Sequence, residues 1–257
     1  MRLFDSHCHL QDERLAGDLE GVMQRAREAG VERFCCCGSS PSDWSAVEQC
    51  AARFQGVVPA FGLHPWYLAD CPTDWLERLR SLLLTHPEAP LGEIGLDHAI
   101  ETDRGAQADV FRLQMELALD LDRPVSVHVR KAWGALLEIL DNLPHLPPAV
   151  IVHAYSGGAE LVPELSVRNV FFSFSGSLTR PGNRRGTAAA IAVPADRLLL
   201  ESDAPDLAPV PAPADRPNEP AFLRHTAETL ARLRGLTLEE TAALTWANAC
   251  RALRLAP

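Results

Sequence analysis

The stretch FDSHCHL, residues 4–10, ends an apolar run in two histidines that flank a cysteine. Three interpretations are open at this point: a Cys/His zinc site, a reactive thiol flanked by bases, or two histidines that act without Cys8. Side chains two positions apart on a β-strand lie on the same face. If the stretch is a strand, His7 and His9 point together, and Cys8 points the other way and packs as a small apolar residue.

Short β-leaning runs like this one recur along the chain and alternate with longer amphipathic runs of helical spacing. The predicted strands are 2–7, 33–38, 57–62, 91–95, 124–128, 149–153, 170–175 and 197–201. Such alternation predicts right-handed βαβ units and a parallel sheet. Eight strands in 257 residues favour an α/β fold of the (β/α)8 TIM-barrel type, as a single domain over residues 1–257. A doubly wound open sheet is the alternative.

Composition narrows the class of protein. A hydrophobic content of 47% excludes a disordered chain, and a net charge of −10 with a single lysine, Lys131, argues against a broad basic face for duplex nucleic acid. No secretory pattern opens the chain, and no apolar run approaches the roughly 20 residues of a membrane span. The seven cysteines lack a regular spacing. We therefore expect a cytoplasmic protein, without a membrane or an obligate protein partner.

Six side chains that can bind metal fall at or near the carboxyl ends of predicted strands, where barrel enzymes build their sites. They are His7, His9, Glu93, His128, His153 and Asp203. A single histidine at a strand end is more often a hydrogen-bonded structural residue, and Glu93 could be a salt-bridged glutamate. Six on one rim instead predict a metal site for zinc, manganese, iron or magnesium. Glu93, between Gly92 and Gly95, could bridge two metals, and Asp203 could accept a proton from bound water.

The chain also resembles the TatD-type metal-dependent hydrolases, within the amidohydrolase-like barrels. The similarity runs along nearly the whole sequence, and its motifs come in the family's order. They are FDSHCHL (4–10), GLHP (62–65), GEIGLD (92–97), the run from Gln107 to Gln114, HVRKA (128–132), HAYSGG (153–158), SGSLT (175–179), LLLESDAP (198–205) and RPNEP (216–220).

The resemblance implies a (β/α)8 barrel with the same six metal ligands, in which Glu93 bridges two metals where related barrels use a modified lysine. It also implies that His64, Arg130 and Tyr155 bind the substrate phosphate. The departures concern loop and packing positions. Trp66 follows GLHP where many relatives have another histidine, His98 follows GLD, and Ala252-Leu253 follows the closing Asn-x-x-Arg motif, which survives as Asn248 and Arg251.

The predicted function is that of a metal-dependent phosphodiesterase, a deoxyribonuclease similar to a 3′–5′ exonuclease that acts on single-stranded DNA or nucleotide ends. Its cofactors would be two divalent ions (or three with substrate bound), with Zn, Mg and Mn not distinguished. Asp203 and Glu93 would be the catalytic residues, and Arg130 and His64 would neutralise phosphate charge. The alternatives are an esterase or deacylase acting on aminoacyl or other esters, and a non-catalytic metal-binding barrel.

Three further segments have predicted roles. The proline-rich stretch 203–220 would be a structured cover after the eighth strand. Residues 221–234 and the helix after the capping box Thr237–Glu240 would pair and close the outside of the barrel. Arg180, Arg184 and Arg185 would guide a phosphate backbone or, alternatively, form a solvated loop without a function.

Overall fold

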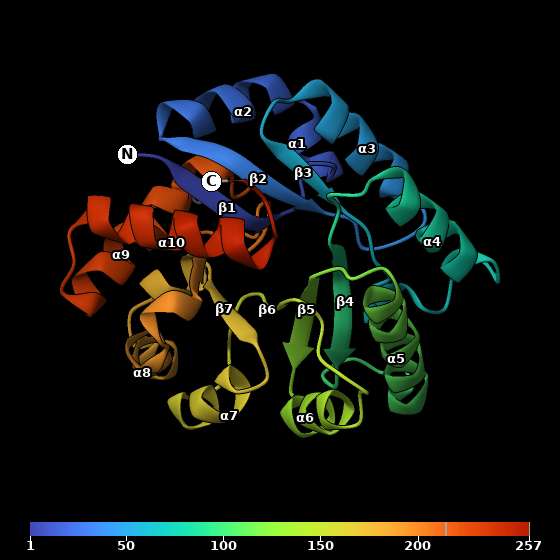
Figure 1. Ribbon diagram of the computed structural model, residues 1–257. Helices are drawn as coiled ribbons and strands as arrows, with labels where there is room; N and C mark the ends of the chain where they lie inside the picture. Colours follow the sequence, from blue (N-terminus) through green and yellow to red (C-terminus); the bar gives the residue numbers. More distant parts are fainter. Residues whose placement is uncertain (214, 257) are drawn as a thin grey trace.

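The computed structural model describes residues 1–213 and 215–256, so positions 214 and 257 of the predicted domain lie outside the described residues. Eight strands alternate with helices along the chain (Figure 1). Every predicted strand is present, with ends that differ from the prediction by at most two residues. The strands are β1 (Leu3–Cys8), β2 (Val31–Cys37), β3 (Val57–Ala60), β4 (Leu91–Asp97), β5 (Val125–Arg130), β6 (Val150–Val152), β7 (Val170–Phe174) and β8 (Leu198–Leu200).

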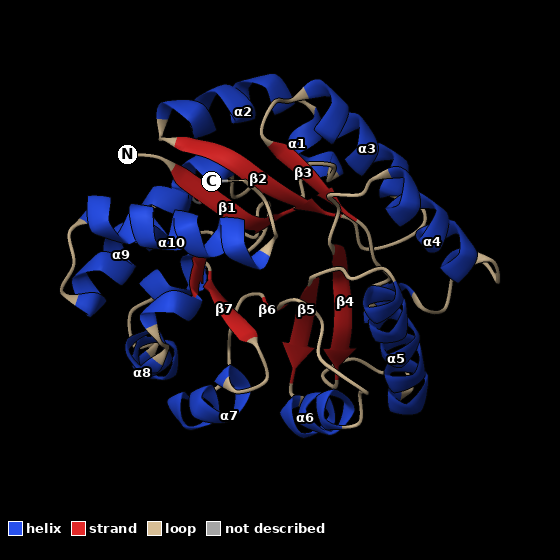
Figure 2. Ribbon diagram, viewed as in Figure 1, coloured by secondary structure: helices blue, strands red, loops and turns tan. Residues whose placement is uncertain are grey.

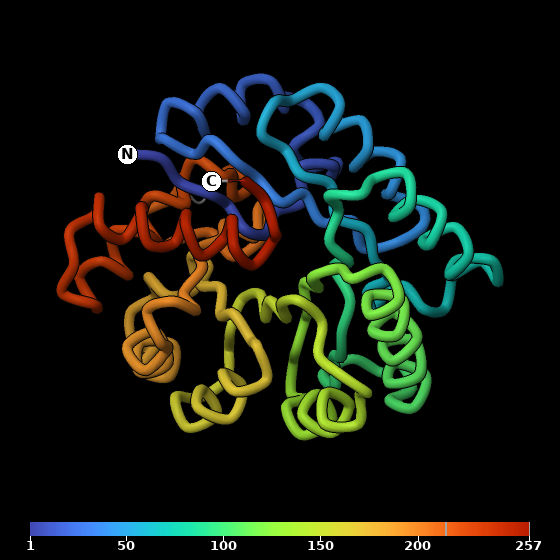
Figure 3. The backbone as a smooth tube through the Cα atoms, viewed as in Figure 1, coloured from blue at the N-terminus to red at the C-terminus, as the bar shows by residue number. Residues whose placement is uncertain are grey.

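The strands are all parallel and stand in sequence order, which excludes the open doubly wound alternative. They form one sheet β1-β2-β3 and a second sheet β4-β5-β6-β7-β8. A parallel bridge from Phe61 to Leu91 joins the two sheets. On the other side, the amide of Asp203 donates to the carbonyl of His7 at 3.0 Å, and the amide of His9 donates to that of Ala204 at 2.7 Å. The ring is a (β/α)8 barrel, and Figure 3 shows the chain circling it in order.

Helices surround the ring of strands, as Figure 2 shows. They are α1 (Glu13–Ala16), α2 (Leu19–Glu28), α3 (Trp44–Arg53), α4 (Trp75–Thr85), α5 (Arg104–Asp120), α6 (Trp133–Asp141), α7 (Val162–Ser166) and α8 (Arg184–Ala192). None of the helices within the described ranges has the length and apolar character needed to cross a membrane.

Cys8 lies in the apolar layer between the strands and these helices. It is fully buried in a cluster with Cys36 of β2, Met23 of α2 and Val47 of α3. Burial raises the pKa of the Cys8 thiol well above its usual range, so the thiol stays protonated. Cys8 is therefore a packing residue on the opposite face from the histidines beside it.

The terminal helices α9 (Leu223–Arg234) and α10 (Leu238–Ala252) follow the barrel, and the capping box between Thr237 and Glu240 is present. Trp246 of α10 joins an apolar cluster with Phe4, Ile151 and Leu199, which come from three different strands. Because Phe4 lies near the start of β1, α10 packs against the amino end of the barrel. The rings of Phe4 and Trp246 lie 5.8 Å apart, and α9 packs against α10, so the two terminal helices form the predicted pair.

The described part of the loop 203–220 is pinned to the barrel. The Asn218 amide donates to the carbonyls of Ser202 and Asp206 at 2.8 and 2.6 Å. Glu219 is buried and pairs with Arg25 of α2, with 2.7 Å between nitrogen and oxygen. These contacts support the predicted structured cover, apart from residue 214.

Asn248 provides a test of how α10 is held. Its buried amide donates to the carbonyls of Ala195 and Leu198, at 2.8 and 2.9 Å. Asn248→Ala leaves both carbonyls without this donor, so we expect the free energy of unfolding in urea to fall by about 1–3 kcal/mol. The control Asn142→Ala removes an amide that bonds the carbonyl of Glu138 at the exposed end of α6, and it should change stability by about 0.5 kcal/mol or less. Equal losses would contradict the assigned role.

Candidate metal centre

The six side chains predicted as metal ligands meet at the carboxyl end of the barrel, although only some of them end strands. His7 lies within β1, Glu93 is the third residue of β4, and His128 lies two residues before the end of β5. The other three follow strands: His9 after β1, His153 after β6 and Asp203 after β8. His7 and His9 still point together, with 3.3 Å between their Nε2 atoms, even though the regular strand ends at Cys8.

The two oxygens of Glu93 face two different groups of histidines. Oε2 lies 3.7 Å from His7 Nε2 and 3.5 Å from His9 Nε2. Oε1 lies 3.2 Å from His128 Nδ1 and 2.7 Å from His153 Nε2. A carboxylate placed in this way can share its oxygens between two cations, which is the arrangement of two-metal sites.

Asp203 completes the group on the Oε2 side of Glu93. Its Oδ1 lies 3.8 Å from His7 Nε2 and 3.6 Å from His9 Nε2. The carboxylate oxygen and the two ring nitrogens therefore converge on one point from residues that are almost two hundred positions apart in the sequence.

Two glycines allow β4 to approach its neighbours closely enough for this. Gly92 and Gly95 have φ values of 156° and 140°, which L side chains rarely adopt. A Cβ at Gly95 would also collide with the carbonyl oxygen of His128 in β5. Close packing of β4 on β5 therefore requires glycine at position 95, and it brings Glu93 next to His128.

Hydrogen bonds to the rear nitrogens orient the imidazole rings. Nδ1 of His9 donates to the carbonyl of Cys37 at 2.8 Å, which turns Nε2 toward the centre. Nδ1 of His7 bonds the hydroxyl of Ser126 at 2.9 Å. His128 is turned round: its Nε2 faces Asp97 Oδ2 at 3.3 Å, and its Nδ1 faces Glu93. Metal-binding histidines are usually held by a second bond of this kind.

The carboxylates and imidazoles of the cluster stabilise each other's charged forms. Burial would raise the pKa of Glu93, but the surrounding imidazoles outweigh it and hold that pKa well below its usual range. Burial lowers the pKa of a histidine, yet Asp203 and Glu93 raise that of His9 to about 10. In the same way, Glu93 overcomes burial and raises the pKa of His153 to about 9. The carboxylates therefore stay ionised and attract positive charge strongly, as protons or as metal cations.

The donor set fits divalent metal ions. Three triads bring their ligand atoms within 4.8 Å of one another: His7, His153 and Asp203; His7, His9 and Glu93; and His64, Glu93 and His128. Tetrahedral ligands at the usual 2.0–2.1 Å from zinc lie roughly 3.4 Å apart, close to the spacings between the atoms here. Imidazole and carboxylate ligands suit zinc, manganese and iron, and the carboxylates also suit magnesium.

His64, which was predicted to bind substrate, also lies in this cluster, with its Nε2 3.4 Å from Glu93 Oε1. Its Nδ1 accepts a hydrogen bond from the backbone amide of Trp66 at 3.2 Å. Burial lowers the pKa of His64 to about 3, so the ring is neutral and carries its proton on Nε2. In this tautomer Nε2–H donates hydrogen bonds and cannot bind a metal, which removes His64 from the third triad as a ligand and favours a contact with substrate.

The other two predicted substrate residues lie in different surroundings. Arg130 is the last residue of β5, and its side chain is exposed, without an ion pair among the described residues. Tyr155 is buried against Phe172 and Trp133, and its hydroxyl donates to the carbonyl of Gly158 at 2.9 Å. The structure does not bring the Tyr155 hydroxyl to the cluster, so its contact with substrate stays a prediction.

Three buried acids around the site were not predicted from the sequence. Asp97 bonds His128, and Glu201 Oε1 lies 3.8 Å from His153 Nδ1, which has no hydrogen-bond partner in the described structure. Asp5 accepts the hydroxyl and the amide of Ser202, at 2.5 and 2.8 Å. Burial raises the pKa of Glu201 to about 8 and that of Asp5 to about 7. The sequence signal that could have indicated them is their position inside motifs that also contain candidate ligands. Asp5 lies in FDSHCHL, Asp97 in GEIGLD and Glu201 in LLLESDAP.

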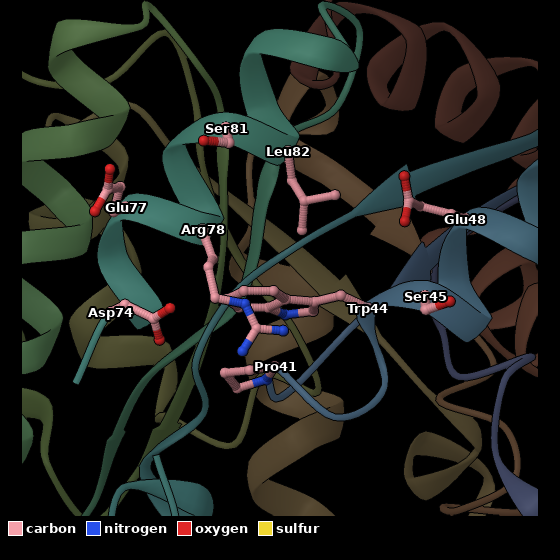
Figure 4. Close-up of a pocket in the computed structure, with 9 residues that line it drawn as sticks. All are labelled: Pro41, Trp44, Ser45, Glu48, Asp74, Glu77, Arg78, Ser81 and Leu82. Atoms are coloured by element: carbon pink, nitrogen blue, oxygen red, sulfur yellow. The ribbon is translucent and has the colours of Figure 1, made fainter. Parts of the chain in front are cut away.

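A surface pocket of about 540 Å³ lies outside the barrel between α3 and α4, and contains none of these residues (Figure 4). Glu48, Asp74 and Glu77 line it together with a single arginine, Arg78, over Trp44. This mostly acidic lining does not suit a phosphate group, so the pocket plays no part in the site.

A parallel barrel with a buried histidine–carboxylate cluster at the carboxyl ends of its strands defines the class of metal-dependent hydrolase barrels. More narrowly, the chain belongs to the TatD-related DNase family, whose family model matches residues 4–254. It is a metal-dependent hydrolase of that family, a class of enzyme that acts on ester bonds.

Relatives of known sequence match over almost their full lengths. The chain is 32% identical to the uncharacterized metal-dependent hydrolase YabD of Bacillus subtilis, over 98% of this chain and 99% of the relative. It is 31% identical to the 3′-5′ ssDNA/RNA exonuclease TatD of Cronobacter sakazakii, over 97% of each. Among solved structures, the TatD homologue YJJV of Escherichia coli superposes with a TM-score of 0.93 at 28% identity, covering 99% of both chains.

Single substitutions can test the proposed ligands. We expect His7→Ala and Asp203→Ala to weaken zinc or manganese binding by at least about tenfold, because each removes one converging donor. Cys8→Ala should keep its metal content while it lowers the melting temperature, because its side chain is buried away from the centre. Elemental analysis after dialysis against each metal measures the difference.

His145→Ala removes an exposed histidine outside the cluster and is the matched control, with an unchanged metal content expected. A large loss of metal in Cys8→Ala, or none in His7→Ala, would show that the assigned ligands are wrong.

Proposed function

We propose that the protein is a phosphodiesterase that removes nucleotides from the 3′ ends of single-stranded DNA, with two divalent ions held by the six clustered residues. The observation that carries the proposal is the position of Glu93, whose two oxygens face separate pairs of histidines. The exonuclease name of the relative from Cronobacter sakazakii supports the choice of substrate.

The charge of the carboxyl rim also supports a phosphate substrate. The protein carries a net charge of −10, yet Arg180, Arg184 and Arg185 are exposed after β7 and make no ion pair within the described residues. Arg130 after β5 is exposed and unpaired in the same way. The guanidinium group of an arginine matches the geometry of a phosphate group and can bind it through two hydrogen bonds. A single strand could therefore approach the centre along the arc from β5 to β7.

When bound, divalent ions would polarise the phosphoryl group and lower the pKa of a water molecule toward neutrality. Asp203 stays ionised, since His9 and His153 outweigh its burial and lower its pKa, and it can accept a proton from the attacking water. His64 presents its Nε2–H as a donor to a phosphoryl oxygen, and Arg130 adds positive charge from the rim. Asp97 and Ser126 hold the rings of His128 and His7 in place.

The activity can be tested with one strand labelled at its 5′ end and a second labelled at its 3′ end. We expect a ladder of shortened products from the first and immediate release of mononucleotide from the second, abolished by EDTA and restored by manganese or magnesium. Asp203→Asn should lower kcat by about a hundredfold or more, because the proton acceptor is lost. The control Asp109→Asn, on the exposed face of α5, should keep full activity.

A panel of aminoacyl and simple esters is run beside the strands. Hydrolysis of esters alone would overturn the nuclease proposal in favour of an esterase or deacylase. Metal binding without hydrolysis of any substrate would favour a non-catalytic barrel.

The arginines after β7 provide a separate test. Replacing Arg180, Arg184 and Arg185 together with serine should reduce the slope of log kcat/KM against log salt concentration by about 2, if each binds one phosphate of the single strand. The control is Arg112→Ser combined with Arg224→Ser, which removes arginines already paired with Asp109 and Glu228. An unchanged slope in the triple variant would assign these arginines to a solvated loop.

A further inference from the structure

Trp66 is unusual among the tryptophans of this chain. It is 53% exposed, whereas Trp44 and Trp246 are buried. It lies in a short turn (Pro65–Tyr67) directly after His64, at the carboxyl end of the barrel, and this position departs from the pattern of the family that the sequence resembles. A large aromatic ring that remains exposed beside the metal centre is available for contact with a ligand.

The indole of Trp66 is held rigidly from the side of the metal centre. Its Nε1–H donates to Asp97 Oδ2 at 2.8 Å, and the same oxygen lies 3.3 Å from Nε2 of His128. Asp97 is itself fully buried, and its other oxygen accepts the amide of Ala99 at 2.8 Å. A ring fixed in this way loses little conformational freedom when a ligand binds to it.

The aromatic neighbours of Trp66 meet the indole at steep angles and do not stack on its faces. His64 meets the ring at 82°, with 5.2 Å between centroids, and His128 meets it at 69° and 6.5 Å. Within the described residues, no aromatic ring stacks parallel to Trp66, and no guanidinium lies over it. Tyr67, the next residue, is also exposed, at 43%. The surface therefore offers a rigid aromatic plane beside His64 and His128.

We propose that Trp66 determines specificity as the stacking platform for the base of the 3′-terminal nucleotide. This proposal rests on the function proposed above. In the ring order of the strands, the turn after β3 stands opposite the arginines after β7, with the metal centre between them. The terminal base lies on Trp66, the scissile phosphate lies at the centre, and the remaining strand leads toward Arg180. Every base has a flat π-face, so this platform accepts all four bases and rejects a nucleotide without one.

The test compares two 5′-labelled oligonucleotides that differ only at the 3′ end, one with adenosine and one with an abasic tetrahydrofuran nucleotide. For the wild-type protein we expect KM for the abasic strand to be higher by on the order of tenfold. Trp66→Ala should show the same KM for both strands, and Trp66→Phe should keep most of the difference because it keeps a ring. Leu84→Ala removes an exposed apolar side chain of α4 and should behave as wild type.

This design separates stacking from support of the metal centre. Both Trp66 variants lose the hydrogen bond to Asp97, so a purely supporting role would lower kcat equally in both and leave the KM ratio of the two strands unchanged. That result, or a wild-type KM ratio near one, would overturn the proposal while the nuclease function stands.

A binding measurement covers the case in which the wild-type protein hydrolyses no strand and the proposed function fails. Tryptophan fluorescence of the Asp203→Asn variant is titrated with each oligonucleotide in the presence of manganese. Quenching by the adenosine strand and not by the abasic one, lost when Trp66→Phe is added, would support the platform. Equal quenching by both strands, or none by either, would overturn it.

Discussion

The burial of the Glu93 carboxylate among histidines is the interaction on which the rest of the site depends. An ionised carboxylate in a protein interior costs several kcal/mol unless partners compensate for it. Here the compensation comes from rings on four other strands or the segments that follow them. The strands must therefore stand in the correct register for the charge to be tolerated. The glycines at 92 and 95 belong to the same constraint, because they allow this carboxylate to sit inside the packed ring.

Most of the fold could be predicted from the sequence because its signal is local and repeated. Eight apolar runs of strand length, separated by amphipathic helices, allow few arrangements other than a barrel. The packing of α10 against the barrel was harder to predict. Its helical pattern and capping box show that a helix forms, but the position of Trp246 depends on residues far away in the sequence, among them Phe4 in β1.

The candidate ligands could be named from the sequence because strand ends converge in a barrel, whatever the details of each strand. The regular strand ends at Cys8, so the strict alternation argument covers His7 but not His9, and the rings meet because both Nε2 atoms face the same carboxylates. The roles of Asp97 and Glu201 could not be predicted, because an acid beside a motif becomes a partner of a histidine only when distant strands bring them together. The tautomer of His64 likewise depends on a backbone amide of its own turn.

The closure of the ring has a consequence for how the protein is made. The two hydrogen bonds between the ends of β1 and β8 join the backbones of His7 and His9 to those of Asp203 and Ala204. The same few residues therefore seal the barrel and supply three of the candidate ligands. During synthesis His7 and His9 are made long before their partners, and the centre cannot assemble until residue 204 has emerged. The hydrolytic centre is thus absent until the chain has closed the ring.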